Sequence, residues 1–311
     1  MYRIWVDEQP LDSVLPMFSG VAEVVGPGAD LIELGTCDGA LDPGARWDAG
    51  RMDRGVRLRV ISRIGVGYDN IDVGAATQRG IQVCYTPHGP TVSTAEHAIA
   101  LIFAAAKTVA YADRDVRSGQ WHRAFRTVKG MELRGRVLGL VGAGRIGIEV
   151  ARVMRAVGMR VVVYDPALTA ERAVAESVER AGSLEGLLSA ADVVSLHATS
   201  TAETRHLINS ARLAWMKSGS ILVNTARGAL VDERALAEAL RSGHLSAAGL
   251  DVFEREPVGA GNPLLDLENV VLTDHIASHT WAGHHRLYEM AVLQLLQVLR
   301  GEQPESPLNS V

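Results

Sequence analysis

The 311-residue sequence has few cysteines, few aromatic residues and no long apolar run. Its two cysteines, Cys37 and Cys84, have no metal-type spacing, which argues against a thiol mechanism and fits a reducing cytoplasm. The longest apolar run, AIALIFAAA at 98–106, is far shorter than the roughly 20 residues that span a bilayer. The start, MYRIWVDEQP, alternates like a first strand and does not resemble a secretion signal. We therefore expect a cytoplasmic protein that does not enter the membrane.

Basic residues are not in excess either. The chain has 31 Lys and Arg against 36 Asp and Glu, a formal charge of −5, so nothing general favours a nucleic-acid partner. One segment, 111–136, is locally basic, with seven Lys or Arg against three acids and with Trp121 and Phe125 interleaved. This composition allows a nucleic-acid patch or an arm that packs on a partner subunit, and it favours the arm.

The length of the chain favours two domains. The runs LRVISRIGV and IQVCY are typical of early strands, and STAEHAIALIFAAAK has a helical period with Ser93 or Thr94 as its cap. From residue 137 apolar strands alternate with helical segments, which predicts a parallel sheet covered on both faces. A last helix is expected at about 283–300, where it returns the chain to the first domain.

The stretch GLVGAGRIG predicts a phosphate-binding turn. It places Gly142, Gly144 and Gly147 in G-x-G-x-x-G register, directly after an apolar strand and at the start of a helix. Asp165 ends the next strand, 18 residues after Gly147, where a carboxylate accepts ribose hydroxyls and repels a 2′-phosphate. The alternative, a glycine-rich turn with a helix-capping Asp, explains less of this context. We predict a site for NAD rather than NADP.

Polar residues end three later strands, at Arg227, at Asp251 and Glu256, and at His275. Such strand ends line the ligand crevice of an open α/β sheet. Reduction of a 2-keto acid needs a cation for the carboxylate and carbonyl, for which the Arg fork is suited. It also needs a proton donor, for which a His paired with a carboxylate is suited. Arg227, His275 and Glu256 fill these roles in turn.

The stretch LTDHIASHTWAGHH, 272–285, is rich in histidine. His275 and His279 are four residues apart, which suits a metal on one helix face, but no Cys or carboxylate accompanies the later histidines at ligand spacing. We expect no metal site. We expect His279 and Trp281 at the mouth of the substrate site or at a domain hinge.

Seven motifs in chain order resemble the D-isomer-specific 2-hydroxyacid dehydrogenases, a family that includes phosphoglycerate dehydrogenases and glyoxylate/hydroxypyruvate reductases. From about residue 57 onward the similar segments are LRVISRIGVGYDNIDV, STAEHAIAL, GLVGAGRIG, ETRHLIN, NTARGALVDE, LDVFEREP and DHIAS. The resemblance implies a Rossmann-type doubly wound parallel sheet, residues 98–277, inserted into a smaller flavodoxin-like α/β substrate domain, residues 1–97 and 278–311. It also implies NAD as cofactor, an active site between the domains, and a homodimer that uses the 111–136 arm.

The resemblance further implies roles for single residues. Arg227, Glu256 and His275 are the catalytic set, and backbone N–H groups around Gly65 and Val66 bind the substrate carboxylate together with Arg227 and His275. The implied cofactor contacts are Thr94, Gly142, Gly144, Arg145, Ile146, Gly147, Asp165, Ala198, Thr204, Thr225, Ala226, Arg227, Asp251 and His275. Asp274 and Thr199 stand where the family often has Pro, and neither change removes a catalytic group.

Other functions on this fold remain as alternatives. Transcriptional corepressors that resemble these dehydrogenases sense NAD and can keep both the glycines and the triad, although no disordered tail suited to a scaffold is visible. Phosphite dehydrogenases carry Lys where Val66 stands, and formate dehydrogenases pair their histidine with Gln. Glu256 favours an alcohol/ketone couple. The sequence therefore predicts an NAD-dependent D-2-hydroxyacid dehydrogenase that acts on a small 2-hydroxy or 2-keto acid.

Overall fold

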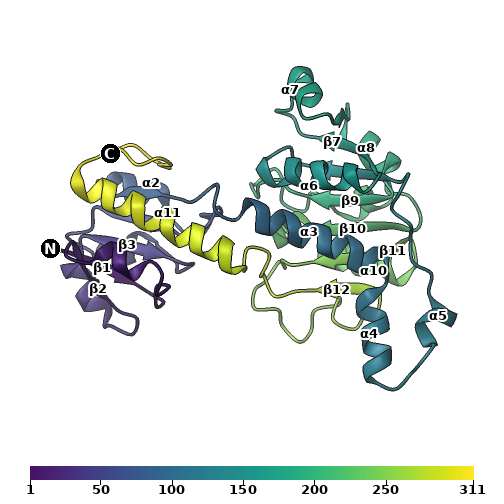
Figure 1. The fold of residues 1–311 in the computed structure, drawn as a ribbon, viewed down its shortest axis with the longest axis horizontal. Helices are drawn as coiled ribbons and strands as arrows, with labels where there is room; N and C mark the ends of the chain where they lie inside the picture. The colour runs from purple at the N-terminus through teal and green to yellow at the C-terminus, as the bar shows by residue number, and fades with distance from the viewer. The chain divides into compact units, whose positions relative to one another are not determined.

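The structure, a computed structural model, describes all 311 residues and divides into two compact units. Unit 1 comprises Met1–Thr91 and His279–Val311, and unit 2 comprises Val92–Ser278. Both chain termini therefore belong to unit 1 (Figure 1). Every strand pair in both sheets is parallel, so the predicted α/β fold with one sheet inserted into the chain of the other is confirmed.

Unit 1 is built on a five-stranded sheet in the order β2-β1-β3-β4-β5. This is the 2-1-3-4-5 order of flavodoxin-like sheets, as predicted. The strands are β1 (Tyr2–Val6), β2 (Ala22–Val25), β3 (Gly39–Asp42), β4 (Val60–Arg63) and β5 (Gln82–Cys84). The shorter helices are η1 (Leu15–Phe18), η2 (Leu31–Thr36), α1 (Ala49–Met52) and α2 (Val73–Gln78), where η marks a 3-10 helix.

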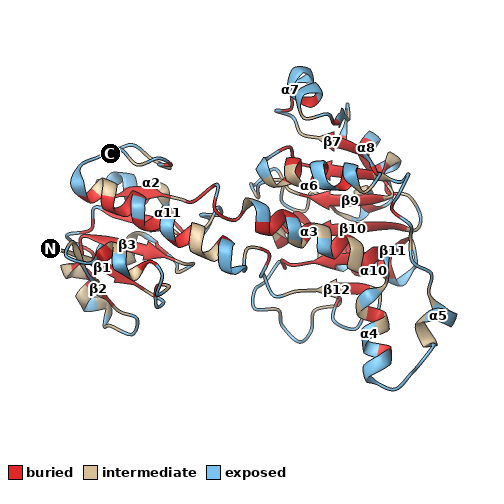
Figure 2. Cartoon of the chain, viewed as in Figure 1, coloured by how far each residue is buried: buried red, intermediate tan, exposed pale blue.

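The last helix of the chain belongs to unit 1. α11 spans Trp281–Arg300, close to the predicted 283–300. Thr280 caps its N-terminus, where the Thr280 hydroxyl accepts a hydrogen bond from the N–H of Gly283 at 2.9 Å. The helix packs against β3, β4 and β5. Its buried face, drawn in red in Figure 2, completes the apolar core on that side of the sheet.

Unit 2 is built on a seven-stranded sheet in the order β12-β11-β10-β9-β6-β7-β8. Counted from β6, this is the 3-2-1-4-5-6 order of Rossmann sheets with one further strand, and the chain order reverses between β6 and β9. Ligands bind outside the carboxyl ends of the strands at such a reversal. The strands are β6 (Val137–Val141), β7 (Arg160–Tyr164), β8 (Glu179–Arg180), β9 (Val193–Leu196), β10 (Ser220–Asn224), β11 (Leu245–Leu250) and β12 (Val270–Leu272).

Helices cover both faces of this sheet, as the buried apolar strands require. Neighbouring residues of β10 point into different clusters: Ile221 and Val223 pack with α3 and α6, whereas Leu222 packs with α8 and α10. The helices are α3 (Thr91–Ala106), α4 (Val109–Arg117), α5 (Arg123–Thr127), α6 (Arg145–Ala156), α7 (Ala170–Ala175), α8 (Leu184–Ala190), α9 (Ser210–Leu213), η3 (Gly228–Leu230) and α10 (Glu233–Arg241).

The predicted cap of α3 is wrong. The helix begins at Thr91, so Ser93 and Thr94 lie within its first turn and are buried rather than capping it. A turn in which the Thr91 N–H donates to the His88 carbonyl precedes the helix and lets it start earlier. No single helix is long and apolar enough to cross a membrane; only α3 and α4 taken together, a pair bent by 65°, meet the length and composition required.

Candidate active site

The glycine turn between β6 and α6 packs closely against the backbone that follows β9. Gly142 has φ +108°, in the region that favours glycine, and a Cβ there would lie 2.6 Å from the carbonyl oxygen of His197. A Cβ on Gly147 would lie 2.4 Å from the carbonyl oxygen of Gly142. Gly144, the N-cap of α6, differs because a Cβ there would meet nothing within 4 Å.

The open space at Gly144 fits a pyrophosphate group. No side chain caps the N-terminus of α6, so the backbone N–H groups of its first turn, which Arg145 and Ile146 begin, remain available to an anion. The helix dipole adds attraction for negative charge at the same point. The turn therefore has both the room and the donors that the predicted dinucleotide needs.

Asp165 lies where an adenosine ribose is expected. Its Oδ2 atom accepts a hydrogen bond from the Ala143 N–H at 2.7 Å, and its Oδ1 atom accepts one from the Ala167 N–H at 2.8 Å. Arg172 donates to the carbonyl oxygen of Ala143 at 2.7 Å. The carboxylate is thus fixed against the glycine turn and is only partly exposed.

The other predicted cofactor residues lie along the same sheet edge or beneath it. Ala198 follows β9, and its backbone nitrogen is 2.9 Å from the point where a Gly142 Cβ would lie. The Thr204 hydroxyl accepts from the Thr201 N–H at 2.7 Å and donates to the Thr199 carbonyl at 2.8 Å. These bonds shape the loop after β9. Thr94 is buried in α3.

Thr225 and Ala226 follow β10, and Thr225 carries an unpaired polar atom. Its Oγ1 is buried and has no hydrogen-bond partner within the chain. A buried polar atom without a partner is unfavourable by roughly 1–3 kcal/mol, so such atoms are uncommon. The hydroxyl is therefore suited to meet a group of a bound ligand.

Arg227 is held by the turn that follows β10. The side chain of Asn224 accepts from the Ala226 N–H at 3.0 Å and donates to the Arg227 carbonyl at 2.9 Å. A Cβ on Gly228 would lie 1.8 Å from the carbonyl carbon of Phe253, so no side chain fits there. The loop that carries Arg227 therefore packs backbone against backbone on the loop that leads to Glu256.

Glu256 and His275 form a hydrogen-bonded pair. His275 Nδ1 donates to Glu256 Oε2 at 2.7 Å, and Glu256 Oε1 accepts from the Phe253 N–H at 2.9 Å. Burial on its own would raise the pKa of Glu256. Hydrogen bonds from His275 and Phe253 and the charges of His275 and Arg227 outweigh burial and hold that pKa below its usual value. Arg227, Glu256 and His275 therefore lie together.

This arrangement can transfer a proton. Because the His275 Nδ1–H is directed at a carboxylate, the ring is fixed and its Nε2 atom is the one left for a substrate. The His275 side chain is 47% exposed, so a ligand can reach it. Arg227 adds a cation suited to a carboxylate beside this donor.

Asp251 makes contacts that the sequence did not predict. It is fully buried at the end of β11, where Thr273, Ile276 and Ala277 donate hydrogen bonds to its carboxylate. Burial alone would raise the pKa of Asp251, but these bonds and one from His97 outweigh burial and lower the pKa to about 2. Asp251 is therefore a carboxylate at any ordinary pH.

The predicted carboxylate-binding loop lies in unit 1, after β4. The Gly65 N–H already donates to the Thr86 hydroxyl at 2.8 Å. Of the two predicted backbone donors, only the Val66 N–H is left for a ligand, and Val66 is 38% exposed. The sequence motif alone did not distinguish the two amides.

The thiols are unsuited to act as thiolates, and the later histidines contact aromatic or polar neighbours. Both cysteines are buried, and burial raises the pKa of Cys84 to about 12. The His279 and His284 rings lie 4.9 Å apart, and His285 Nδ1 is 3.0 Å from Ser13 Oγ. No three His, Cys, Asp or Glu side chains are placed to hold a metal ion.

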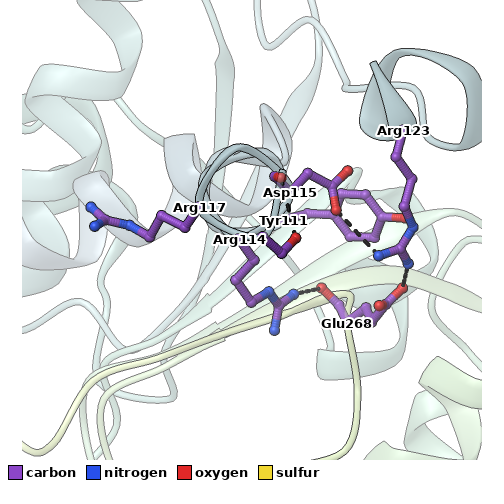
Figure 3. Close-up of a pocket in the computed structure, with 7 residues that line it drawn as sticks. Tyr111, Arg114, Asp115, Arg117, Arg123 and Glu268 are labelled. Carbon is purple, nitrogen blue, oxygen red and sulfur yellow. Dashed lines mark hydrogen bonds and ion pairs between the residues drawn. The ribbon is translucent and has the colours of Figure 1, made fainter. Parts of the chain in front are cut away.

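A pocket of about 440 Å³ lies away from these residues, on the 111–136 arm (Figure 3). Arg123 bridges Asp115 and Glu268 there, and Arg114 donates to the Glu268 carbonyl at 2.6 Å. Arg117 forms an ion pair with Asp113, one turn earlier on α4. Because acids or carbonyls already hold these arginines, the arm does not present them as a free basic patch. The lining residues are Tyr111, Arg114, Asp115, Arg117, Ser118, Arg123 and Glu268.

Comparison with known proteins gives a consistent result. Residues 99–277 match the family model for the NAD binding domain of D-isomer specific 2-hydroxyacid dehydrogenases. A glyoxylate reductase of Korarchaeum cryptofilum is 43% identical over 308 residues, which cover 98% of this chain and 89% of that protein. A D-3-phosphoglycerate dehydrogenase of Archaeoglobus fulgidus is 48% identical over 233 residues, which cover 75% of this chain. The same alignment covers 44% of that dehydrogenase, which is less than half of its length. A solved structure of a Thermus thermophilus protein is 41% identical, with a TM-score of 0.90 over 99% of this chain and 100% of that one.

Proposed function

The chain belongs to the D-isomer specific 2-hydroxyacid dehydrogenase family, and we propose that it transfers a hydride between NAD(H) and a small D-2-hydroxy acid or 2-keto acid. The observation that carries this proposal is the 2.7 Å hydrogen bond between His275 and Glu256 beside Arg227. Unit 2, which holds this triad, also holds the turn that fits a dinucleotide pyrophosphate. The two requirements of the reaction therefore occur on one sheet edge.

In the reducing direction each triad residue has one task. Arg227 binds the substrate carboxylate and polarises the carbonyl group. NADH, when bound, would supply the hydride that the carbonyl carbon accepts. His275 Nε2 gives its proton to the carbonyl oxygen in the same step, and in the oxidising direction it takes the hydroxyl proton back. Glu256 stays ionised because of its lowered pKa, so it stabilises the imidazolium form and keeps Nε2 directed outward.

The cofactor preference follows from Asp165. Its fixed carboxylate can accept both ribose hydroxyls, but it repels the 2′-phosphate of NADP because both groups are negative. We infer that NAD is the cofactor. The N–H groups at Arg145 and Ile146 would then hold the pyrophosphate, and the unpaired Thr225 hydroxyl would be a further polar contact for the cofactor.

The substrate class is a small 2-hydroxy or 2-keto acid. Relatives named glyoxylate reductase, glyoxylate/hydroxypyruvate reductase and D-3-phosphoglycerate dehydrogenase support glyoxylate, hydroxypyruvate and a phosphorylated hydroxypyruvate as candidates. We infer that the Val66 N–H is a further ligand of the substrate carboxylate. A phosphite dehydrogenase is disfavoured because that family has Lys where this chain has Val66.

The test is a screen of 2-keto acids that follows NADH absorbance, with the His275→Ala protein as matched control. Consumption of NADH by the wild-type protein, abolished in the variant, supports the proposal. Tight NADH binding without turnover of any acid would favour a corepressor-like NAD sensor. Reduction of NAD by phosphite would favour the phosphite dehydrogenase alternative.

A homodimer through the arm is part of the proposal. Trp121 and Phe125 are 70% and 74% exposed on the arm, which favours burial against another chain. Sedimentation of the Trp121→Ser, Phe125→Ser double variant should show a shift toward monomer relative to the wild type. A cytoplasmic location stays a prediction, supported by the two free buried thiols.

A further inference from the structure

The loop that carries His275 has a backbone conformation that must be held in place. His275 has φ +58°, in the left-handed region that residues with side chains rarely adopt. Such a conformation is unfavourable and persists only when surrounding contacts fix it. The direction of the His275 ring depends on those contacts, because the side chain leaves the backbone at this point.

Asp251 supplies most of the contacts that hold the loop around His275. Its carbonyl oxygen accepts from the His275 N–H at 2.8 Å. Its Oδ1 atom accepts from the Thr273 hydroxyl at 2.6 Å and the Ile276 N–H at 2.9 Å, and its Oδ2 atom accepts from the Ala277 N–H at 3.0 Å. One buried residue is thus bonded to the loop on both sides of His275.

His97, on α3, extends this network from outside the loop. Its Nε2 atom is 3.0 Å from Thr273 Oγ1 and 3.3 Å from Asp251 Oδ1. The single hydroxyl proton of Thr273 is used by its bond to Asp251, so Thr273 Oγ1 can only accept from His97. The proton of His97 is therefore on Nε2, which donates to Thr273 Oγ1 and also lies within reach of Asp251 Oδ1, while Thr273 donates to Asp251.

We propose that His97, Thr273 and Asp251 are positioning residues that fix the left-handed loop and thereby aim His275 at the substrate. The inference rests on the proposed dehydrogenase function. It adds a role for His97 and Thr273, and it gives Asp251 a task besides the nicotinamide carboxamide contact implied by resemblance. None of the three needs to touch the substrate for this purpose.

The test uses pairs of variants that differ by one hydrogen bond in the full-length protein. Thr273→Val removes the hydroxyl at nearly constant shape, and Thr273→Ser restores it. His97→Leu removes the donor, and His97→Gln restores an N–H at the position of Nε2. Thr77→Val, which removes a hydroxyl from α2 in unit 1, controls for the loss of a threonine hydroxyl elsewhere.

The first measurement is amide hydrogen exchange over 273–278 without any ligand. Exchange at Ile276 and Ala277 should accelerate roughly three- to tenfold in Thr273→Val and His97→Leu, because each loses a bond that fixes the loop. It should return toward the wild-type rate in Thr273→Ser and His97→Gln. Unchanged exchange in both disruptive variants overturns the proposal, whether or not the protein proves to be a dehydrogenase.

The second measurement separates positioning from cofactor contact. In Thr273→Val and His97→Leu we expect kcat to fall roughly ten- to a hundredfold, since small misplacement of a catalytic group has effects of this size. The Kd for NADH should stay within about twofold, because neither Thr273 nor His97 has an assigned contact with the dinucleotide. A Kd that rises in parallel with the fall in kcat, with exchange unchanged, assigns these residues to the cofactor and overturns the proposal.

Discussion

His275 Nδ1 lies 2.7 Å from Glu256 Oε2, and this contact fixes which ring nitrogen faces a substrate. A carboxylate can only accept, so the proton of the pair is on Nδ1 and the reactive position is Nε2. Such a pair is suited to donate and recover a proton at Nε2.

The first prediction compares His275→Ala with Glu256→Gln. His275→Ala should lower kcat by roughly two to four orders of magnitude, because the proton donor is lost. Glu256→Gln keeps an oxygen for the Phe253 N–H but removes the charge, so its kcat should fall less than that of His275→Ala. Steady-state kinetics with the best keto acid checks both. Near wild-type rates in His275→Ala would show that another group donates the proton.

Arg227→Lys tests the guanidinium. A lysine keeps the positive charge but loses the planar fork that binds a carboxylate at two points. We expect KM for the keto acid to rise and kcat to fall, by roughly tenfold each for the loss of one charge-assisted bond. Arg227→Ala should be more severe in both constants. An unchanged KM in both variants would remove Arg227 from substrate binding.

Asp165→Asn tests the cofactor preference. The amide oxygen can still accept a backbone N–H, while the negative charge is gone. Removal of one like-charge contact is an effect on the order of 1 kcal/mol, so relative use of NADPH should improve about fivefold. The measurement is the ratio of kcat/KM for NADPH and NADH. A wild-type ratio near one would contradict the role given to Asp165.

A pair of glycine variants tests the phosphate-binding turn. Gly144→Ala places a methyl group in open space, so we expect normal thermal stability and a raised Kd for NADH. Gly142→Ala forces a Cβ to within 2.6 Å of the His197 carbonyl at φ +108°, so we expect a lowered Tm. Calorimetry and NADH titration of both proteins check this. Wild-type affinity in Gly144→Ala would place the pyrophosphate elsewhere.

The lowered pKa of Asp251 predicts that the stability of the fold depends on pH. Its pKa in the folded protein is about 2, below the usual 3.8, so it stabilises the fold above pH 4. That contribution is lost as the pH falls from about 4 to about 2, and linkage puts it at about 2 kcal/mol. Asp251→Asn should therefore show a flatter decline of unfolding free energy in this range, measured by urea titration. Parallel curves for the two proteins would contradict the lowered pKa.

Most of the secondary structure of unit 2 could be predicted from its sequence, because strong local sequence patterns agree with one another there. Apolar strands alternate with helices from residue 137 on, and the glycine turn stands between β6 and α6 as expected. The proximity of Arg227, Glu256 and His275 could be predicted too, since they come after neighbouring parallel strands. Strand ends that share one sheet edge are brought together by the topology itself.

Other features could not be predicted because they depend on contacts between distant segments. β2 and β3 are short and lack a clear alternation, and β8 has only two residues. The bond of His97 to Thr273 joins residues 176 apart in the chain. The start of α3 at Thr91 depends on the turn that precedes it, whereas the sequence alone suggested Ser93 or Thr94 as the cap. Spacing along a chain does not reveal which of these side chains meet.

The contact at Gly228 has a consequence for how the enzyme can diversify. With a hypothetical Cβ only 1.8 Å from the Phe253 carbonyl carbon, the segments that bear Arg227 and Glu256 meet so closely at Gly228 that no side chain fits between them. A backbone change in the segment that bears Arg227 would therefore also disturb the segment that bears Glu256. Segments outside this contact can change loop length or side chains without meeting the same steric limit.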